Sequence, residues 1–187
     1  MSDAIDYANS LLRGENVRLR EVREPDLAQL ADWWNDPAVK VLQTLWVRPT
    51  PTAGTIDLMR GWNANAGNDA GFAVELLDGG ALIGQATLHG VDKNRCATLA
   101  IVLGPPYWSA GYGTDALRVL VRYGYVEMGL HRIQLETFAF NTRGIAAYRR
   151  VGFAEEGRRR EAMFHAGQWH DTVQMAQLAP DWWAANG

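Results

Sequence analysis

The sequence has a single cysteine, Cys96, among its 187 residues. One thiol forms no internal disulfide and supplies too few thiolates for a cysteine-ligated zinc site. No apolar segment is long enough to span a bilayer. The first fifteen residues contain three acidic side chains and no long apolar core, so no signal peptide is visible. These absences predict a soluble, cytoplasmic protein that has no metal site and no membrane partner.

The sequence also lacks an excess of positive charge. Its 18 Lys and Arg residues against 21 Asp and Glu residues give a net charge of −3, whereas nucleic-acid binding needs a basic face. An apolar fraction of 48% is enough for a buried core. We therefore expect one domain over residues 1–187 and no nucleic-acid partner. Within it, residues 1–14 are expected to form an N-terminal arm or short helix, and residues 179–187 a C-terminal tail.

The spacing of apolar residues predicts alternating strands and helices. A strand with period-two alternation is expected at 17–22, and strand-like segments are expected at 72–77, 81–88, 95–103, 132–138, 153–163 and 169–178. Helices with apolar residues three and four apart are expected at 24–35, 52–64, 114–128 and 141–150, with residues 38–51 irregular. This order predicts an α/β fold, with a mixed sheet that is antiparallel at first, contains a β-α-β unit in its second half and carries helices on its faces.

The most informative stretch lies between Ala97 and Phe153. A strand leads into the loop 104–110, which contains two prolines, and then into Gly111 and Gly113 at the start of a helix. Glycines allow a ligand to approach the backbone closely, and the free N–H groups and dipole of a helix N-terminus favour an anion. The loop therefore predicts a phosphate site, the alternative being a tight turn before a structural helix.

A dinucleotide-binding site is a competing interpretation of the same glycines. Residues 111–116 fit the pattern G-x-G-x-x-G/A, and Glu136 lies twenty residues beyond Ala116. In the dinucleotide fold, however, the glycines follow their strand directly, whereas the loop 104–110 intervenes here. The chain also begins with helices and a hairpin rather than βαβ units. An NAD(P)-binding oxidoreductase is thus the less favoured hypothesis, and the absence of a Gly-Lys-Ser/Thr triplet excludes a P-loop kinase.

Taken in order, these residues resemble the GNAT acyltransferase superfamily, especially its ribosomal-protein alanine and serine N-acetyltransferase branch. The family's pyrophosphate loop, Arg/Gln-x-x-Gly-x-Gly/Ala, corresponds to residues 108–113, where Trp108 replaces Arg/Gln. Asn141, Tyr148 and Gly152-Phe153 match the downstream Asn…Tyr-x-x-x-Gly-Phe segment. The resemblance covers roughly residues 15–178. It implies the GNAT fold, a central mixed β-sheet with splayed parallel strands flanked by helices.

The resemblance further implies acetyl-CoA as co-substrate, held at the pyrophosphate by the loop and at the pantetheine by an open strand edge. Asn141 would bond the pantetheine, the alternative being the N-cap of its helix. Tyr148 would be the catalytic acid that protonates the leaving thiolate, the alternative being an aromatic anchor. The residues implied in binding the co-substrate are Ile101, Val102, Leu103, Ser109, Ala110, Gly111, Tyr112, Gly113, Thr114 and Asn141.

The acceptor side is less defined by the sequence. An amine must lose a proton before it attacks a thioester, and the family commonly places a glutamate where Thr98 stands here. Threonine cannot act as that base. The remaining candidates are His89, Glu136 and Glu75, or a water chain that relays the proton. Trp34 and Trp46 are expected in the acceptor wall, the alternative being core packing.

Together these observations predict transfer of an acetyl group from acetyl-CoA to a primary amine by direct attack in a ternary complex. The acceptor would be a protein N-terminus or a small amine. A backbone N–H near Val102 or Leu103 would stabilise the oxyanion. The missing acid at Thr98 also leaves open a CoA-binding regulatory or interaction module without turnover. The oligomeric state is open, a homodimer included.

Overall fold

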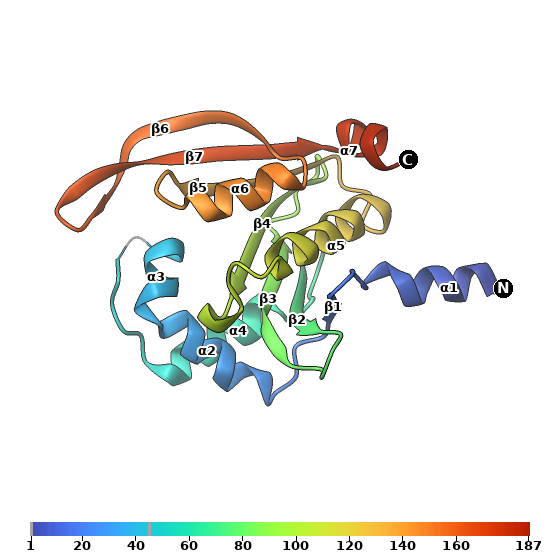
Figure 1. The fold of residues 1–187 in the computed structure, drawn as a ribbon, viewed down its shortest axis with the longest axis horizontal. Helices are drawn as coiled ribbons and strands as arrows, with labels where there is room; N and C mark the ends of the chain where they lie inside the picture. Colours follow the sequence, from blue (N-terminus) through green and yellow to red (C-terminus); the bar gives the residue numbers. More distant parts are fainter. Residues whose placement is uncertain (1, 45) are drawn as a thin grey trace.

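The computed structural model describes residues 2–44 and 46–187. Within them, one seven-stranded sheet has the order β1-β2-β3-β4-β5-β7-β6 (Figure 1). The strands are β1 Val17–Arg20, β2 Ala70–Leu76, β3 Leu82–His89, β4 Cys96–Leu103, β5 Arg132–Phe138, β6 Ala154–His165 and β7 Gln168–Leu178. The helices are α1 Ser2–Leu11, α2 Asp26–Asn35, α3 Pro37–Gln43, α4 Thr52–Trp62, α5 Tyr112–Val126, α6 Thr142–Arg150 and α7 Ala179–Asn186, with a 3₁₀ turn η1 at Pro105–Tyr107.

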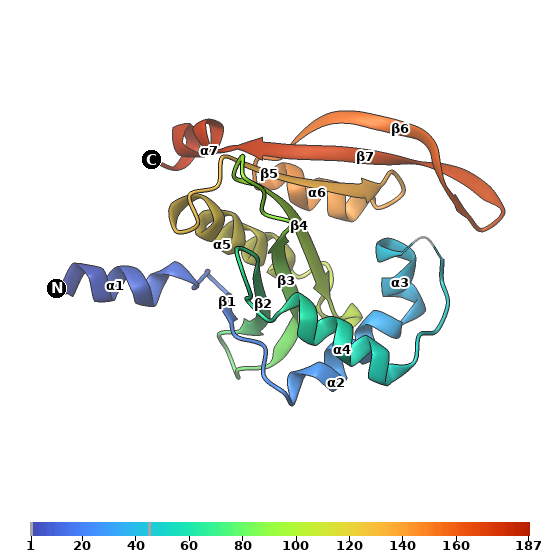
Figure 2. The same ribbon diagram turned by 180° about the vertical axis from the view of Figure 1, so that it is seen from behind.

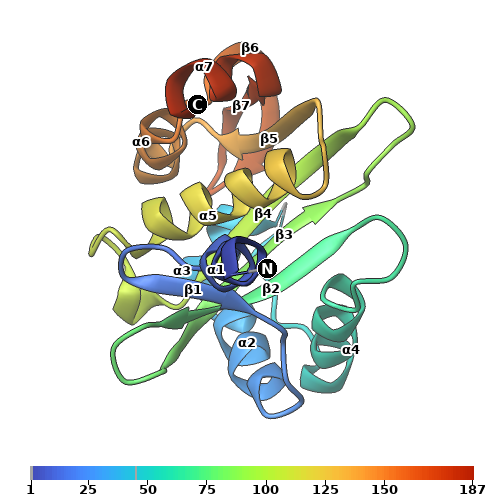
Figure 3. The ribbon, with the colours of Figure 1, turned by 90° about the vertical axis from the view of Figure 1, so that its right-hand side faces the viewer.

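Helices cover both faces of the sheet. α5 and α6 lie on one side, and α2 and α4 lie on the other (Figure 3). α5 has the expected apolar face: Leu117, Leu120 and Val121 are buried in the same core cluster as Leu88 and Ile133 of the sheet. No helix in the described part of the chain is both long and apolar enough to cross a bilayer. The mixed α/β sheet predicted from the sequence is confirmed.

The single parallel ladder of the sheet, between β4 and β5, is short. It pairs Cys96 with Arg132 and ends where Thr98 pairs with Gln134, although β4 continues to Leu103. Beyond Thr98 the two strands diverge (Figure 2), while the other edge of β4 remains paired with β3. One backbone edge of residues 99–103 therefore faces a gap in the sheet.

Two segments differ from the sequence prediction. The segment 38–51, expected to be irregular, contains most of α3, and its residue 45 lies outside the described part. In the segment 1–14, residue 1 lies outside the described part and the remainder includes α1. Asp36 accepts a hydrogen bond from the Ala38 N–H at 2.8 Å, so the residues that end α2 also begin α3. The expected tail forms α7, because the Trp182 side chain is buried against Tyr125, with 5.6 Å between ring centroids.

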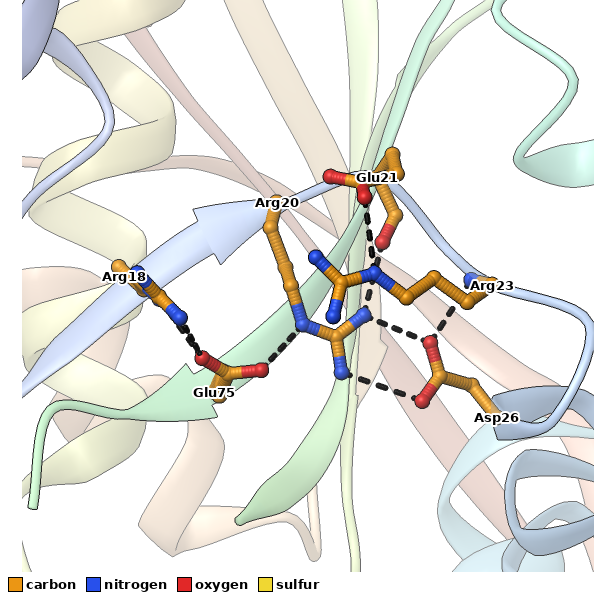
Figure 4. A network of polar contacts seen from close by, with 6 residues as sticks. All are labelled: Arg18, Arg20, Glu21, Arg23, Asp26 and Glu75. Atoms are coloured by element: carbon orange, nitrogen blue, oxygen red, sulfur yellow. Dashed lines mark hydrogen bonds and ion pairs between the residues drawn. The ribbon is translucent and has the colours of Figure 1, made fainter. Parts of the chain in front are cut away.

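A buried ionic network ties the first two strands to α2. Glu75 on β2 is only 4% exposed and accepts hydrogen bonds from Arg18 and Arg20 of β1 (Figure 4). Arg20 also pairs with Asp26 at the start of α2, at 2.6 Å. Burial raises the pKa of Glu75, but the hydrogen bonds from Arg20 and Arg18 outweigh it and hold that pKa below its ordinary value of 4.5. Glu75 is therefore an ionised structural residue.

We predict that Glu75→Gln lowers the free energy of unfolding by about 3 kcal/mol at neutral pH, because it leaves the buried Arg20 with one carboxylate. Denaturant titration at pH 7 measures the loss. Ionised Glu75 stabilises the fold above its unfolded-state pKa and loses this effect as the pH falls through its lower folded-state pKa. The difference in the free energy of unfolding between wild type and Glu75→Gln should therefore shrink below about pH 4.

Glu21→Gln is the matched control, since Glu21 and its partner Arg23 are both exposed. It should change stability by less than about 1 kcal/mol. Equal losses in the two variants would contradict a structural role specific to Glu75.

Candidate functional site

A cleft opens beside the free edge of β4, between the glycine loop, α3 and α6. Nine of the residues predicted to bind or process the co-substrate line it: Ile101, Val102, Leu103, Ser109, Gly111, Gly113, Thr114, Asn141 and Tyr148. Ala110 and Tyr112 belong to the same loop and helix start but are not among the lining residues. The fold thus brings the strand edge, the loop and α6 to one place, which we name the first cleft.

The glycine loop has the backbone shape of an anion-binding nest. Ser109 and Gly111 both have positive φ values, 63° and 86°, and N–H groups near such left-handed residues converge on one side. Gly111 is the N-cap of α5, and no side chain caps that end. Gly113 and Thr114 of the first turn line the cleft. The helix dipole and the uncapped N–H groups therefore favour an anion here.

Asp115, also in the first turn of α5, faces another part of the structure. Its carboxylate accepts hydrogen bonds from the backbone N–H groups of Glu15, Asn16 and Val17, at 3.1, 2.7 and 3.0 Å. Asp115, the acidic residue that follows the glycine loop in the sequence, thereby anchors the start of β1. It does not line the first cleft.

Trp108, which stands where the family pattern has Arg or Gln, packs against an arginine from α6. The Arg143 guanidinium lies 3.9 Å from the centroid of the indole ring, within the range of a cation–π contact. Burial lowers the pKa of Arg143, yet a guanidinium stays charged in proteins. Arg143 and Arg150 both line the first cleft and no carboxylate does. The cleft is therefore electropositive.

The direction of the β4 backbone groups follows from one hydrogen bond at its end. The Gly104 N–H donates to Ile83 O of β3 at 2.9 Å. Backbone groups alternate sides along a strand, so even-numbered residues face β3, whereas Ile101 and Leu103 face the gap. Of the two residues expected to supply an oxyanion-stabilising N–H, Val102 thus turns its N–H toward β3 and Leu103 toward the gap.

Side chains already bind two of the carbonyl groups on the gap side of β4. Gln43 Nε2 donates to Ile101 O at 3.2 Å, and Trp108 Nε1 donates to Leu103 O at 2.8 Å. The N–H groups of Ile101 and Leu103 remain directed into the gap. A ligand lying there would therefore act mainly as a hydrogen-bond acceptor toward β4.

Asn141 and Tyr148 place two different polar groups in the first cleft. Asn141 caps α6, with its Oδ1 accepting from the Gly144 N–H at 3.1 Å and its Nδ2 donating to Thr137 Oγ1 at 3.1 Å. Burial raises the pKa of Tyr148 to about 12, and its ring lies edge-on to Phe153. The Tyr148 hydroxyl therefore keeps its proton at neutral pH.

A second cleft lies on the other side of the β4 edge. Trp34 and Trp62 form part of its wall and contact each other edge to face, 5.0 Å apart. Its polar lining includes Asn65, Asp69, Gln85, Thr87 and His89. The two clefts share Gln43, Ile101 and Val102. Sequence reasoning missed Gln43, Asn65 and Asp69, because they lie outside any motif and only the fold brings them to the cleft.

The other candidates on the acceptor side lie apart. Trp46 is 66% exposed and lines neither cleft. Glu136 is exposed, 3.4 Å from Arg159, and Glu75 belongs to the buried network described above. Among the three candidate bases only His89 lines the second cleft, where its Nδ1 lies 3.3 Å from Thr87 Oγ1.

No group of three or more His, Cys, Asp or Glu side chains suited to a metal ion occurs among residues 2–44 and 46–187. His165 and His170, flanking the β6–β7 turn, lie with ring centroids 6.4 Å apart. The Phe140 ring lies beside both, with its centroid 6.1 Å from that of His165 and 5.1 Å from that of His170.

Comparison with known proteins identifies the family. The family model described as "Acetyltransferase (GNAT) domain" matches residues 16–154. A putative ribosomal N-acetyltransferase of Bacillus subtilis, YdaF, is 26% identical over 172 residues, which are 90% of this chain and 94% of the relative. A spermidine N(1)-acetyltransferase of Escherichia coli is 29% identical over 82 residues, 44% of each chain.

Solved structures agree on the fold. A spermidine N-acetyltransferase from Vibrio cholerae, solved with CoA and spermine, superposes with a TM-score of 0.80 at 21% identity, covering 89% of this chain and 98% of that one. The alternative hypothesis of an NAD(P)-binding oxidoreductase is therefore wrong: the sheet is largely antiparallel, and it lacks the doubly wound parallel arrangement of that class. The chain belongs to the GNAT family of N-acetyltransferases.

Proposed function

We propose that this protein transfers the acetyl group of acetyl-CoA to the primary amine of a small cationic acceptor. The observation that carries the proposal is the meeting of two clefts at the free edge of β4, where they share Gln43, Ile101 and Val102. One cleft is electropositive and the other has an aromatic wall and a carboxylate. Two substrates bound in these clefts would meet without a covalent enzyme intermediate, which fits direct attack in a ternary complex.

The first cleft fits acetyl-CoA, the acetyl donor of the GNAT family. The nest at Ser109–Gly111 and the N-terminus of α5 would hold the pyrophosphate, with Arg143 adding positive charge. The N–H of Leu103 would bond the pantetheine arm in the gap. When bound, acetyl-CoA supplies an activated thioester carbonyl. The N–H of Ile101, a residue that lines both clefts, is then the backbone donor proposed for the oxygen of that carbonyl.

Tyr148 is the proposed proton donor to the leaving sulfur. Its pKa of about 12 lies above the value of about 8.5 for an ordinary thiol, so full proton transfer is uphill by roughly 5 kcal/mol on reference values. Burial that raises the pKa of Tyr148 would raise the pKa of a thiol in the same place as well, so the gap between the two pKa values would be smaller. Tyr148 would therefore donate a hydrogen bond to the sulfur throughout the reaction and its proton late.

His89 is the proposed acceptor of the proton that the amine loses. It is the candidate base that lines the second cleft, and Thr87 Oγ1 beside its Nδ1 would help to orient the ring. Glu75 is ion-paired with Arg18 and Arg20 and is therefore not available as a base. Proton transfer from the amine would run directly to His89 or through one water molecule.

A small cationic amine fits the second cleft better than an N-terminal peptide does. Indole rings attract cations, and the rings of Trp34 and Trp62 form one wall. Asp69 adds a carboxylate to the same cleft. The relatives support both classes of acceptor, since one is named a spermidine N(1)-acetyltransferase and another a putative ribosomal N-acetyltransferase.

The proposed activity predicts thiol release from acetyl-CoA that depends on an added amine. The purified chain should be incubated with small diamines and polyamines and, in parallel, with peptides carrying free N-terminal Ala or Ser. We expect mass spectrometry to detect acetylated small amines at higher kcat/KM than acetylated peptides. Saturable CoA binding without product from any acceptor would instead support the non-catalytic CoA-binding module.

Tyr148→Phe should lower kcat by about 100-fold, because it removes the proton donor, while the Kd for CoA stays within about twofold. The wild-type kcat/KM should rise with pH as the acceptor amine loses its proton. The pH profile of kcat/KM reports the pKa values of the free enzyme, and burial raises that of Tyr148 to about 12. The profile should therefore show no alkaline decline up to about pH 10.5. An unchanged kcat in Tyr148→Phe would overturn the role of Tyr148, whereas a decline centred near pH 9 that is absent in Tyr148→Phe would contradict the raised pKa of Tyr148.

Gly113→Ala should separate ligand binding from stability. Gly113 lies in the first turn of α5, where the nearest atom to an added Cβ is Leu103 Cδ1 at 3.5 Å. The methyl group therefore fits the free protein, and Ala should stabilise the helix by about 0.5 kcal/mol. Calorimetry should nevertheless show at least about tenfold weaker CoA binding, because the loop must approach the pyrophosphate closely.

Two comparisons make the Gly113→Ala result specific. Binding of pantetheine, which has no pyrophosphate, should be unchanged in Gly113→Ala. Gly111→Ala should instead lower the free energy of unfolding by about 1–2 kcal/mol, since its φ of 86° disfavours a side chain. If Gly113→Ala bound CoA as tightly as wild type, the glycine loop would not be the pyrophosphate site.

A further inference from the structure

Gln43, the last residue of α3, lies where the two clefts meet. Of the three residues that line both clefts, Ile101 and Val102 have apolar side chains and Gln43 alone has a polar one. α3 stands at the open end of the gap between β4 and β5 (Figures 1 and 2), and Gln43 Nε2 donates to Ile101 O across that gap at 3.2 Å. No motif on the sequence singles out this residue.

The amide of Gln43 has hydrogen-bonding capacity to spare. A side-chain amide has two N–H donors and one acceptor oxygen. Within residues 2–44 and 46–187, the bond to Ile101 O is the only hydrogen bond of this side chain. That bond uses one N–H of the amide, and the second N–H has no hydrogen-bond partner among the described residues.

The position of Gln43 is set by a buried lysine on the same helix. Lys40, only 3% exposed, donates from Nζ to Asn35 Oδ1 at 2.7 Å and to Thr50 Oγ1 at 2.8 Å. These bonds join α3 to the end of α2 and to the segment before α4. Asp36 caps the other end of α3. A donor held in this way is oriented before the reaction begins, which is the condition for effective electrostatic stabilisation.

We propose that Gln43 is a catalytic residue whose free Nε2–H hydrogen-bonds the oxygen of the reacting acetyl carbonyl and stabilises the negative charge that develops on it. The inference rests on the proposed function, because an acetyl donor in the first cleft and an amine in the second must react where the clefts meet. Gln43 thereby complements the Ile101 N–H: one donor comes from a strand edge and the other from a helix outside the glycine-loop region.

Gln43→Met tests this role, because methionine matches glutamine in length and has no N–H donor. Loss of one donor to a developing oxyanion lowers kcat by about 10²–10³-fold in other enzymes, and we expect a loss in that range. The Kd for CoA, which has no acetyl carbonyl, should stay within about twofold. Gln29→Leu, at an exposed position of α2, is the control and should leave kcat unchanged.

A spectroscopic measurement detects the proposed hydrogen bond without turnover. Infrared difference spectra of acetyl-CoA labelled with ¹³C at the carbonyl should show a lower stretching frequency bound to wild type than in solution. Gln43→Met should remove much of this shift, and Gln29→Leu should keep it. Gln43→Glu has no N–H donor, and its carboxyl loses its O–H donor when it ionises. Its activity should therefore fall as the pH rises and a negative charge forms beside the developing one.

The outcomes separate the two proposals. If acetyl-CoA binds and the carbonyl frequency and kcat are the same in wild type and Gln43→Met, the role of Gln43 is overturned while the acetyltransferase proposal stands. If wild type binds no acetyl-CoA, the proposed function fails and the role of Gln43 fails with it. Circular dichroism of both Gln43 variants checks that they fold. A carbonyl shift lost in Gln43→Met but kept in Gln29→Leu supports the inference.

Discussion

The early end of the parallel ladder between β4 and β5 is the constraint on which the rest of the site depends. Backbone N–H and C=O groups need partners, and the ladder stops where Thr98 pairs with Gln134. Gln43 and Trp108 satisfy two carbonyl groups beyond that point, which leaves the N–H groups of the same residues directed into the gap. An incomplete sheet thus provides a linear set of donors that a ligand can complete.

The arrangement of charge keeps the two clefts distinct. Asp115, nearest the glycine loop, is bound to the backbone of residues 15–17, and Glu75 is enclosed by Arg18 and Arg20 (Figure 4). Neither carboxylate lines the first cleft, where Arg143 remains free of acidic residues among those described. The second cleft has Asp69 instead. The two clefts on either side of one strand edge therefore differ in charge.

Local sequence patterns predicted most helices and strands, because an element with one buried face repeats apolar residues at a characteristic spacing. They failed at α3 and α7. The Asn35-Asp36-Pro37 segment ends α2 and also begins α3. The same residues can end one helix and begin the next, so the local pattern did not distinguish the two. α7 depends on the packing of Trp182 against Tyr125, residues 57 positions apart along the chain, and no window of neighbouring residues contains that contact.

The sequence by itself determined the family, the glycine loop and the order of strands and helices around it, since these depend on residues close together in the chain. Only the tertiary structure decided which side chains meet at the acceptor side. Gln43, Asp69 and His89 come from separate segments, and folding brings them beside β4. Burial and hydrogen bonding likewise decided that Glu75 is structural and that His89 faces the cleft, because both depend on neighbours distant in sequence.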